Sequence, residues 1–293
     1  MIKQLLVVIT LLVSFIAPAR ADVPQSIAVI DSGTNTSLFK DNIAYEVCVL
    51  TLFKCPNGKT TMEGLGAANI PPTTDINFNH GTEMLSVILQ VNPSVKIIPI
   101  RIVGITQSGA QSAYSLDDVK NALNWVVANR KKYNIVAVSL SQGKIFAGCK
   151  VPATMAQSIS ALKSAQVPVM AAVGNDEDHT SVFSPACLSD AVAVGAVDSA
   201  LSTIKTTDYD KTIARYSNGA QGQTDFFLDA RYITTQLNGS TKFTAGTSNS
   251  TAALAAWWVL NKKDSFDETF NSILSSTIAV KNEFQTGRYV RIP

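Results

Sequence analysis

Histidine is scarce in this chain of 293 residues, which contains only two, His80 and His179. Any imidazole that acts as a general base must therefore be one of these two side chains. Beyond the first 21 residues, no stretch is long and apolar enough to cross a bilayer. Net charge is small as well, with 24 basic and 22 acidic residues. Two of the basic residues, Lys3 and Arg20, lie in the first 21. The remainder is nearly neutral and gives no reason to expect nucleic acid as a partner.

The first 21 residues have the pattern of an export signal. Lys3 supplies a positive start, Leu5–Ile16 is a short apolar run, and Ala19-Arg20-Ala21 places small residues where a signal peptidase cleaves. Cleavage would leave residues 22–293, which are enough for one large α/β domain with a substantial core. An uncleaved anchor is the alternative. We expect a secreted or periplasmic protein with no integral membrane segment once the signal is removed.

The four cysteines are Cys48, Cys55, Cys149 and Cys187. An even number in an exported chain favours disulfides, and four cysteines allow three pairings. We favour Cys48–Cys55, which closes a short loop, together with Cys149–Cys187. Buried free thiols are the alternative, and a structural zinc site is disfavoured because the spacings are not those of a metal cluster.

Strand-like and helix-like segments alternate along the chain, with no internal repeat and no linker that would divide two domains. The strand-like runs are rich in Val, Ile and Ala, which is typical of strands covered on both faces. This alternation predicts an α/β fold of three layers, α/β/α, around a central and mostly parallel sheet. The predicted strands are Ser26–Ile30, Val95–Val103, Ile135–Leu140, Val167–Val173 and Ala191–Val197, with helices after Ser115 and over Ala153–Ala165.

An aspartate, a histidine and a serine, each in a short motif, follow one another along the chain. Asp31 lies in Ile-Asp-Ser-Gly, His80 opens His-Gly-Thr, and Ser248 closes Gly-Thr-Ser. A serine hydroxyl is a poor nucleophile until an imidazole removes its proton, and a carboxylate must hold that imidazole in one tautomer. Asp31 follows a predicted strand, where open α/β sheets place their active sites. Ser248 precedes an Ala-rich helical stretch, so free N–H groups would lie beside it.

Each of these motifs is weak when taken alone. Asp31 could be a loop or cap residue, and a helix N-cap role for Ser248 is compatible with catalysis. His179 lies in a polar run and is interpreted as a solvated loop histidine. Asn175 ends a predicted buried strand, where its amide could donate a hydrogen bond to an oxyanion, although Gly-Asn is more often a turn.

Together these segments resemble the subtilisin-like serine proteases (the subtilases, or peptidase S8 family), and the resemblance spans nearly all of residues 22–293. It implies that Asp31 orients His80 and that His80 takes the proton from Ser248. It further implies that Asn175 and the backbone N–H of Ser248 bind the oxyanion.

The resemblance also implies a set of substrate-binding residues. Ser139, Leu140 and Ser141 would take up the substrate as an extra antiparallel strand. Ala172, Val173 and Gly174 belong to the strand that ends in the oxyanion asparagine. Phe183 stands where the family forms the bottom of its primary specificity pocket, so we expect a shallow pocket that favours small or medium apolar P1 residues.

The chain departs from the family pattern at several points. Ser141 replaces the usual glycine, and Asn249–Ala252 replaces a segment that usually contains proline, which could loosen the start of the helix. No pro-segment fits before Asp31, so the chain would fold unaided or with a separate folding helper or inhibitor. The calcium-binding loop that many relatives insert after the histidine is not apparent. We therefore expect no cofactor for the chemistry and see no sign of a calcium site.

These observations predict an exported serine endopeptidase that acts on peptide or protein substrates. A subtilase-like pseudoenzyme, which would bind a peptide or partner without cutting it, is the alternative. An α/β-hydrolase esterase would need Gly-x-Ser-x-Gly and a histidine last in order, and the chain has neither. Activity should rise with pH through the titration of His80, at about pH 6–7.

Overall fold

The computed structural model describes residues 23–70, 73, 75–112, 114–199 and 211–293, so the predicted signal peptide lies outside the described residues. Within these residues an 11-stranded sheet has the strand order β12-β13-β9-β7-β6-β5-β1-β4-β2-β3, with β8 paired to β7. Its pairs are parallel except β2–β3, β7–β8 and β12–β13. The strands are β1 (Ser26–Asp31), β2 (Val47–Val49), β3 (Thr61–Glu63), β4 (Lys96–Arg101), β5 (Ile135–Leu140), β6 (Val169–Ala172), β7 (Val192–Ser199), β8 (Lys211–Ile213), β9 (Phe226–Asp229), β12 (Ile278–Lys281) and β13 (Thr286–Tyr289).

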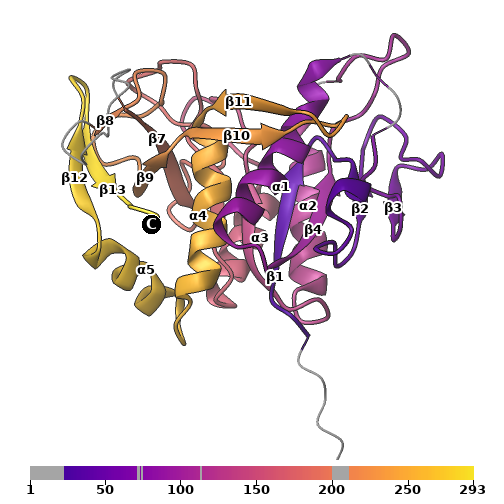
Figure 1. Ribbon diagram of the computed structural model, residues 1–293, viewed down its shortest axis with the longest axis horizontal. Coiled ribbons are helices and arrows are strands. Elements are labelled where there is room, and N and C mark those ends of the chain that lie inside the picture. Colours follow the sequence, from indigo (N-terminus) through magenta and orange to yellow (C-terminus); the bar gives the residue numbers. More distant parts are fainter. Residues whose placement is uncertain (1–22, 71–72, 74, 113, 200–210) are drawn as a thin grey trace, which may run out of the picture.

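Helices cover both faces of this sheet, as Figure 1 shows. On one face α1 packs against α4, and on the other α2 packs against α3. The predicted three-layer α/β/α fold is thereby confirmed. The helices are α1 (Asn79–Val91), α2 (Leu116–Asn129), α3 (Ala153–Ser164), α4 (Thr247–Asn261) and α5 (Phe266–Ser275), with 3-10 turns η1 (Thr36–Phe39) and η2 (Ile76–Phe78).

The inner residues of the central strand β1, Ile27–Ile30, are all apolar because both faces of the strand are buried. Ile27 and Val29 lie in the core beneath α1 and α4, whereas Ala28 and Ile30 lie in the core beneath α2 and α3. All four side chains are at most 1% exposed. A strand between two helical layers buries both of its faces, so its side chains do not alternate between apolar and polar.

Local capping signals agree with the helix starts. Ser115 accepts a hydrogen bond from the Asp118 N–H at 3.1 Å, and Asp118 accepts one from the Ser115 N–H at 2.8 Å, as the capping-box pattern predicts. Such a cap contributes about 1 kcal/mol to helix stability. Ser265 and Glu268 form a second capping box, at the start of α5. This second box was not predicted from the sequence.

Both favoured disulfides are present. Cys48–Cys55 ties β2 to the loop that follows it, with Cα atoms 5.9 Å apart. Cys149–Cys187 joins the segment before α3 to the segment before β7, with Cα atoms 5.8 Å apart. All four cysteines are therefore paired, which excludes the free-thiol and zinc alternatives.

A two-stranded hairpin, β10 (Arg231–Thr235) and β11 (Thr241–Ala245), stands apart from the main sheet and was not anticipated from the sequence. Figure 1 shows it lying across one edge of the molecule, opposite the edge where β1 enters. It is fastened to α1, because the Gln90 side chain donates to the Ile233 carbonyl at 3.0 Å and the Thr235 N–H donates to the Ser86 hydroxyl at 3.1 Å.

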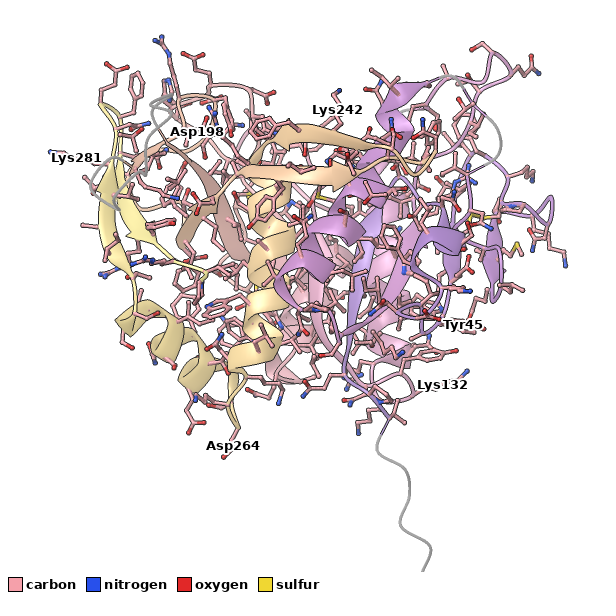
Figure 2. The ribbon with its side chains drawn as sticks, viewed as in Figure 1. Tyr45, Lys132, Asp198, Lys242, Asp264 and Lys281 are labelled. Atoms are coloured by element: carbon pink, nitrogen blue, oxygen red, sulfur yellow. A yellow bond between two sulfur atoms is a disulfide. The ribbon has the colours of Figure 1, made fainter. Side chains whose placement is uncertain are left out.

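The opposite edge carries an aromatic cluster. Tyr45 stacks on Trp125 and Tyr133, and Lys132 lies 4.8 Å from the centre of the Tyr133 ring. Figure 2 shows Tyr45 and Lys132 far from Lys242, which rises from β11.

Among the described residues no helix has the length and apolarity needed to span a membrane.

Candidate active site

The four residues predicted to carry the chemistry come from four elements that end or begin at one edge of the sheet. Asp31 is the last residue of β1, His80 the second of α1, and Ser248 the second of α4. Asn175 follows the end of β6. His80, Ser248 and Asn175 line one cleft, which β11 also lines, at the carboxyl ends of the parallel strands.

Asp31 and His80 form a hydrogen-bonded pair. The distance from His80 Nδ1 to Asp31 Oδ1 is 2.7 Å, and the carboxylate is only 2% exposed. The Ser32 N–H also donates to Oδ1, at 2.6 Å. Because an ionised carboxylate only accepts, the hydrogen must lie on Nδ1, which leaves Nε2 free to act as a base.

Close backbone packing brings the aspartate and histidine segments together. A Cβ atom on Gly81 would lie 1.9 Å from the Gly33 carbonyl oxygen, so only glycine fits beside His80. The Gly81 N–H donates to the Ser32 hydroxyl at 3.0 Å, which joins the two segments directly.

The charges around His80 favour its protonated form. Burial on its own would lower the pKa of His80, but the charge of Asp31, the hydrogen bond to it and the charge of Glu83 outweigh burial. The pKa of His80 is therefore raised above its ordinary value of 6.5. Glu83 lies one turn along α1 and lines the same cleft.

Ser248 lies in the first turn of α4, where backbone N–H groups have no carbonyl one turn earlier to accept them. Its hydroxyl donates to the Ser141 carbonyl at 3.5 Å, and the Ser141 hydroxyl donates to the Ser248 carbonyl at 3.2 Å. In the part of the chain that the structure describes, no hydrogen bond joins the Ser248 hydroxyl to the His80 ring. Hydrogen bonds of this kind are often long or misaligned before a substrate binds.

Polar side chains anchor the start of α4, where this chain lacks the proline that the resembled family usually has. Asn249 donates to the Ala230 carbonyl at 2.8 Å, and the Ser250 hydroxyl donates to the Leu228 carbonyl at 3.0 Å. Asn249 and Ser250 are fully or almost fully buried. These contacts hold the first turn of α4 against β9 and the residue after it.

Asn175 is held by its carbonyl oxygen, which leaves its amide NH2 as the available donor. The Thr247 N–H and the Thr247 hydroxyl both donate to Asn175 Oδ1, at 2.9 and 3.0 Å. These two hydrogen bonds from Thr247, the residue before Ser248, orient the Asn175 side chain. A hydrogen-bond donor beside the nucleophile is what an oxyanion requires.

Comparison with known proteins decides the family. The model of the Subtilase family matches residues 24–278. The chain belongs to this family. The extracellular serine proteinase of Thermus sp. (strain Rt41A) is 25% identical over 183 residues, which make up 61% of this chain and 42% of that protein. The chain thus spans less than half of the length of that relative.

Solved structures agree on the fold. The S41 psychrophilic protease superposes with a TM-score of 0.70 at 15% identity, over 92% of each chain. A cold-adapted subtilisin-like serine proteinase superposes with a TM-score of 0.63 at 19% identity, over 92% of this chain and 89% of the other. At these identities the likeness establishes a subtilisin-like fold.

The substrate-binding residues expected for a subtilase divide into two groups. The side chains of Ser139, Leu140 and Val173 are fully buried, and that of Ala172 is 5% exposed, so these four belong to the sheet and its core. Ser139 and Leu140 are flanked by β1 on one side and β6 on the other. Ser141 follows the last residue of β5 and lines the cleft, so it lies outside the paired strand.

Phe183 and Gly174 lie together beside this cleft. A Cβ on Gly174 would lie 2.5 Å from the Phe183 ring, and one on Gly143 would lie 2.9 Å from the Phe183 Cβ. Gly174 also has a φ of +105°, which glycine adopts without strain. The half-buried Phe183 ring thus fills the space between the segment after β5 and the segment after β6.

Sequence reasoning missed several residues that shape the site. Gln142, Glu83 and Lys242 all line the cleft. Glu83 could have been found from its position three residues after His80 on the same helix. Gln142 and Lys242 carry no local signal, because only the tertiary fold brings them to His80.

Side chains that commonly bind metal ions do not cluster among the described residues. Among the described residues, no group of three or more His, Cys, Asp and Glu side chains could hold an ion. That the chemistry requires no cofactor, and that the sequence gives no indication of a calcium site, stay predictions. His179 stacks on the ring of Phe284 with centroids 3.4 Å apart and does not line the cleft.

Proposed function

We propose that this subtilase is an exported serine endopeptidase that uses Asp31, His80 and Ser248 as a catalytic triad. The observation that carries the proposal is the 2.7 Å contact between His80 and Asp31 in a cleft that Ser248 and Asn175 also line. Export is supported by the two disulfides and by the Thermus relative, which is described as extracellular.

Acyl transfer in this cleft begins with a rotation about the Cα–Cβ bond of Ser248, which turns its hydroxyl from the Ser141 carbonyl toward His80. Nε2 of His80 takes the proton while the oxygen attacks the peptide carbonyl. Asn175 and the Ser248 N–H stabilise the resulting oxyanion. The C–N bond then breaks as His80 returns the proton to the leaving amine, and water releases the acyl group by the same steps.

Substrate recognition would use backbone hydrogen bonds from the segment that begins at Ser141, since the preceding strand is paired on both sides. Backbone recognition tolerates many sequences. The Phe183 ring between Gly143 and Gly174 supports a shallow primary pocket, which would favour small or medium apolar P1 residues.

The deciding experiment is active-site titration of the purified mature protein with an organophosphonate, beside digestion of an unstructured protein. Labelling and digestion in the wild type that both vanish in Ser248→Ala would support the proposal. A folded wild type that neither reacts nor digests the substrate would favour the alternative, a subtilase-like pseudoenzyme that binds peptides without cutting them.

A further inference from the structure

Gln142 contacts both members of the His80–Asp31 pair. Its side-chain nitrogen donates to Asp31 Oδ1 at 3.2 Å and lies 3.3 Å from His80 Nδ1. Asp31 Oδ1 thus accepts from three donors, the other two being Ser32 and His80. The second carboxylate oxygen, Oδ2, is buried without a hydrogen-bond partner among the described residues.

The backbone holds Gln142 firmly against the pair. Its neighbour Ser141 exchanges hydrogen bonds with Ser248, at 3.2 and 3.5 Å. On the other side, the Tyr114 hydroxyl donates to the Gly143 carbonyl at 2.6 Å. Consecutive residues of one short segment therefore contact the nucleophile and the acid–base pair.

We propose that Gln142 is a positioning residue, whose amide holds the Asp31 carboxylate in place against His80 and opposes protonation of the imidazole. The kinetic part of this inference rests on the proposed function, whereas the part that concerns protonation does not. Nothing in the motifs of the sequence indicates the role, because it depends on a contact across 62 positions of the chain.

Electrostatics give the direction of the effect. The Gln142 NH2 group carries partial positive charge and lies beside Nδ1, where it disfavours an imidazolium. Its hydrogen bond to Asp31 also partly compensates the negative charge of the carboxylate, which favours the imidazolium. Gln142 therefore acts against Asp31 and Glu83, and replacing it should make His80 easier to protonate.

The charged and titratable groups that face His80 come from several elements. Asp31 ends β1, and Glu83 follows on α1 itself. Lys242 of β11 is a cation that lines the same cleft. Tyr114 precedes α2 and stays neutral, since burial raises the pKa of its phenol. None of these groups changes in the Gln142 and Gln111 variants.

The scarcity of histidine makes a direct measurement simple. The ring protons of His80 and His179 can be followed by NMR as pH changes, and a His179→Gln background leaves one resonance to assign. In that background Gln142→Leu should raise the pKa of His80 by about half a unit, the size that one neutral hydrogen bond supports. Gln142→Glu, nearly identical in shape, should raise it by about one unit or more because it adds a negative charge.

Gln111 offers a matched control. It lines the same cleft, but its side chain donates to the Asn77 carbonyl at 3.4 Å and not to the pair. Gln111→Leu should leave the pKa of His80 unchanged. Unchanged titrations in both Gln142 variants, or a downward shift in Gln142→Glu, would overturn the proposal.

Kinetics provide the second readout. At a pH where His80 is fully neutral, Gln142→Leu should lower kcat by about tenfold with a smaller change in KM, because the base is less well aligned. Lowering pH should then reduce its activity earlier than in the wild type. The NMR titration needs no turnover, so it tests Gln142 even if the organophosphonate titration shows that the protein cuts nothing. A KM effect alone, with an unshifted pH profile, would reduce Gln142 to a substrate contact.

Discussion

Replacing Asn175 with aspartate should separate the two tasks of this side chain. Its Oδ1 accepts from the Thr247 N–H and hydroxyl at 2.9 and 3.0 Å, so an aspartate of the same shape keeps both contacts. The NH2 group, which is the proposed oxyanion donor, becomes an acceptor oxygen. Asn175→Asp therefore removes the donor without removing the scaffold.

The magnitude follows from the loss of one preorganised donor. Removing such a donor costs about 3–4 kcal/mol of transition-state stabilisation, and each 1.36 kcal/mol is about tenfold in rate, so kcat should fall by about 100- to 1000-fold. Repulsion between the new carboxylate and the oxyanion adds to this loss. KM should change little, because the ground-state carbonyl is bound weakly by the same group.

The assay is steady-state hydrolysis of one chromogenic peptide by the wild type, Asn175→Asp and Thr247→Val. Thr247→Val is the matched control, since it removes one donor to Asn175 Oδ1 but leaves the NH2 group in place. It should lose less than about tenfold in kcat. If Asn175→Asp kept kcat within tenfold while remaining folded in a thermal scan, an oxyanion role for this amide would be refuted.

Proteolysis should rise with pH through a titration above 6.5, since the raised pKa of His80 keeps the base protonated to higher pH. Glu83→Gln removes a charge that raises this pKa, so the pH–rate curve should move to lower pH; an upward movement would contradict the assignment. Loss of the Cys149–Cys187 bond through paired alanines, which opens a span of 38 residues, should reduce the free energy of unfolding by about 4 kcal/mol. Urea unfolding measures this free energy, and a loss near zero would contradict a stabilising role for the disulfide. Phe183→Gly should extend cleavage toward larger P1 residues in a P1-varied peptide library, and an unchanged profile would mean that the ring does not limit the pocket.

The core of the fold was predictable because its strands are buried on both faces. β5 spans Ile135–Leu140, the same bounds as the sequence predicts, and β1 extends the prediction by one residue to Asp31. Continuous runs of Val, Ile and Ala are a strong signal for such strands. The residues proposed to carry the chemistry stand out in the sequence for a different reason, since they lie in short motifs, and the close approach at Gly81 shows the conformational requirement of one of these motifs.

The periphery was not predictable in the same way. Among the described residues, β10 and β11 pair only with each other, and their exposed positions include Ile233 and Phe243, which are 63% and 57% exposed. Neither strand alternates between polar and apolar residues, so its sequence does not indicate a buried face. Within Asp41–Asp75, β2 and β3 are three residues each, which is too short for a periodic signal. Tertiary contacts with α1 and β4 stabilise these elements.

Ser141 shows how a departure from the family pattern can be accommodated at the site. A side chain in place of glycine would leave a buried hydroxyl without a partner unless the structure supplied one, at a penalty of about 1–3 kcal/mol. Here the hydroxyl donates to the Ser248 carbonyl at 3.2 Å, and the residue is only 8% exposed. The substitution therefore ties the proposed substrate-binding segment to the helix that carries the nucleophile. The same tie fixes the backbone from which Gln142 reaches Asp31, so Ser141→Gly should weaken the restraint on the acid–base pair as well as on Ser248.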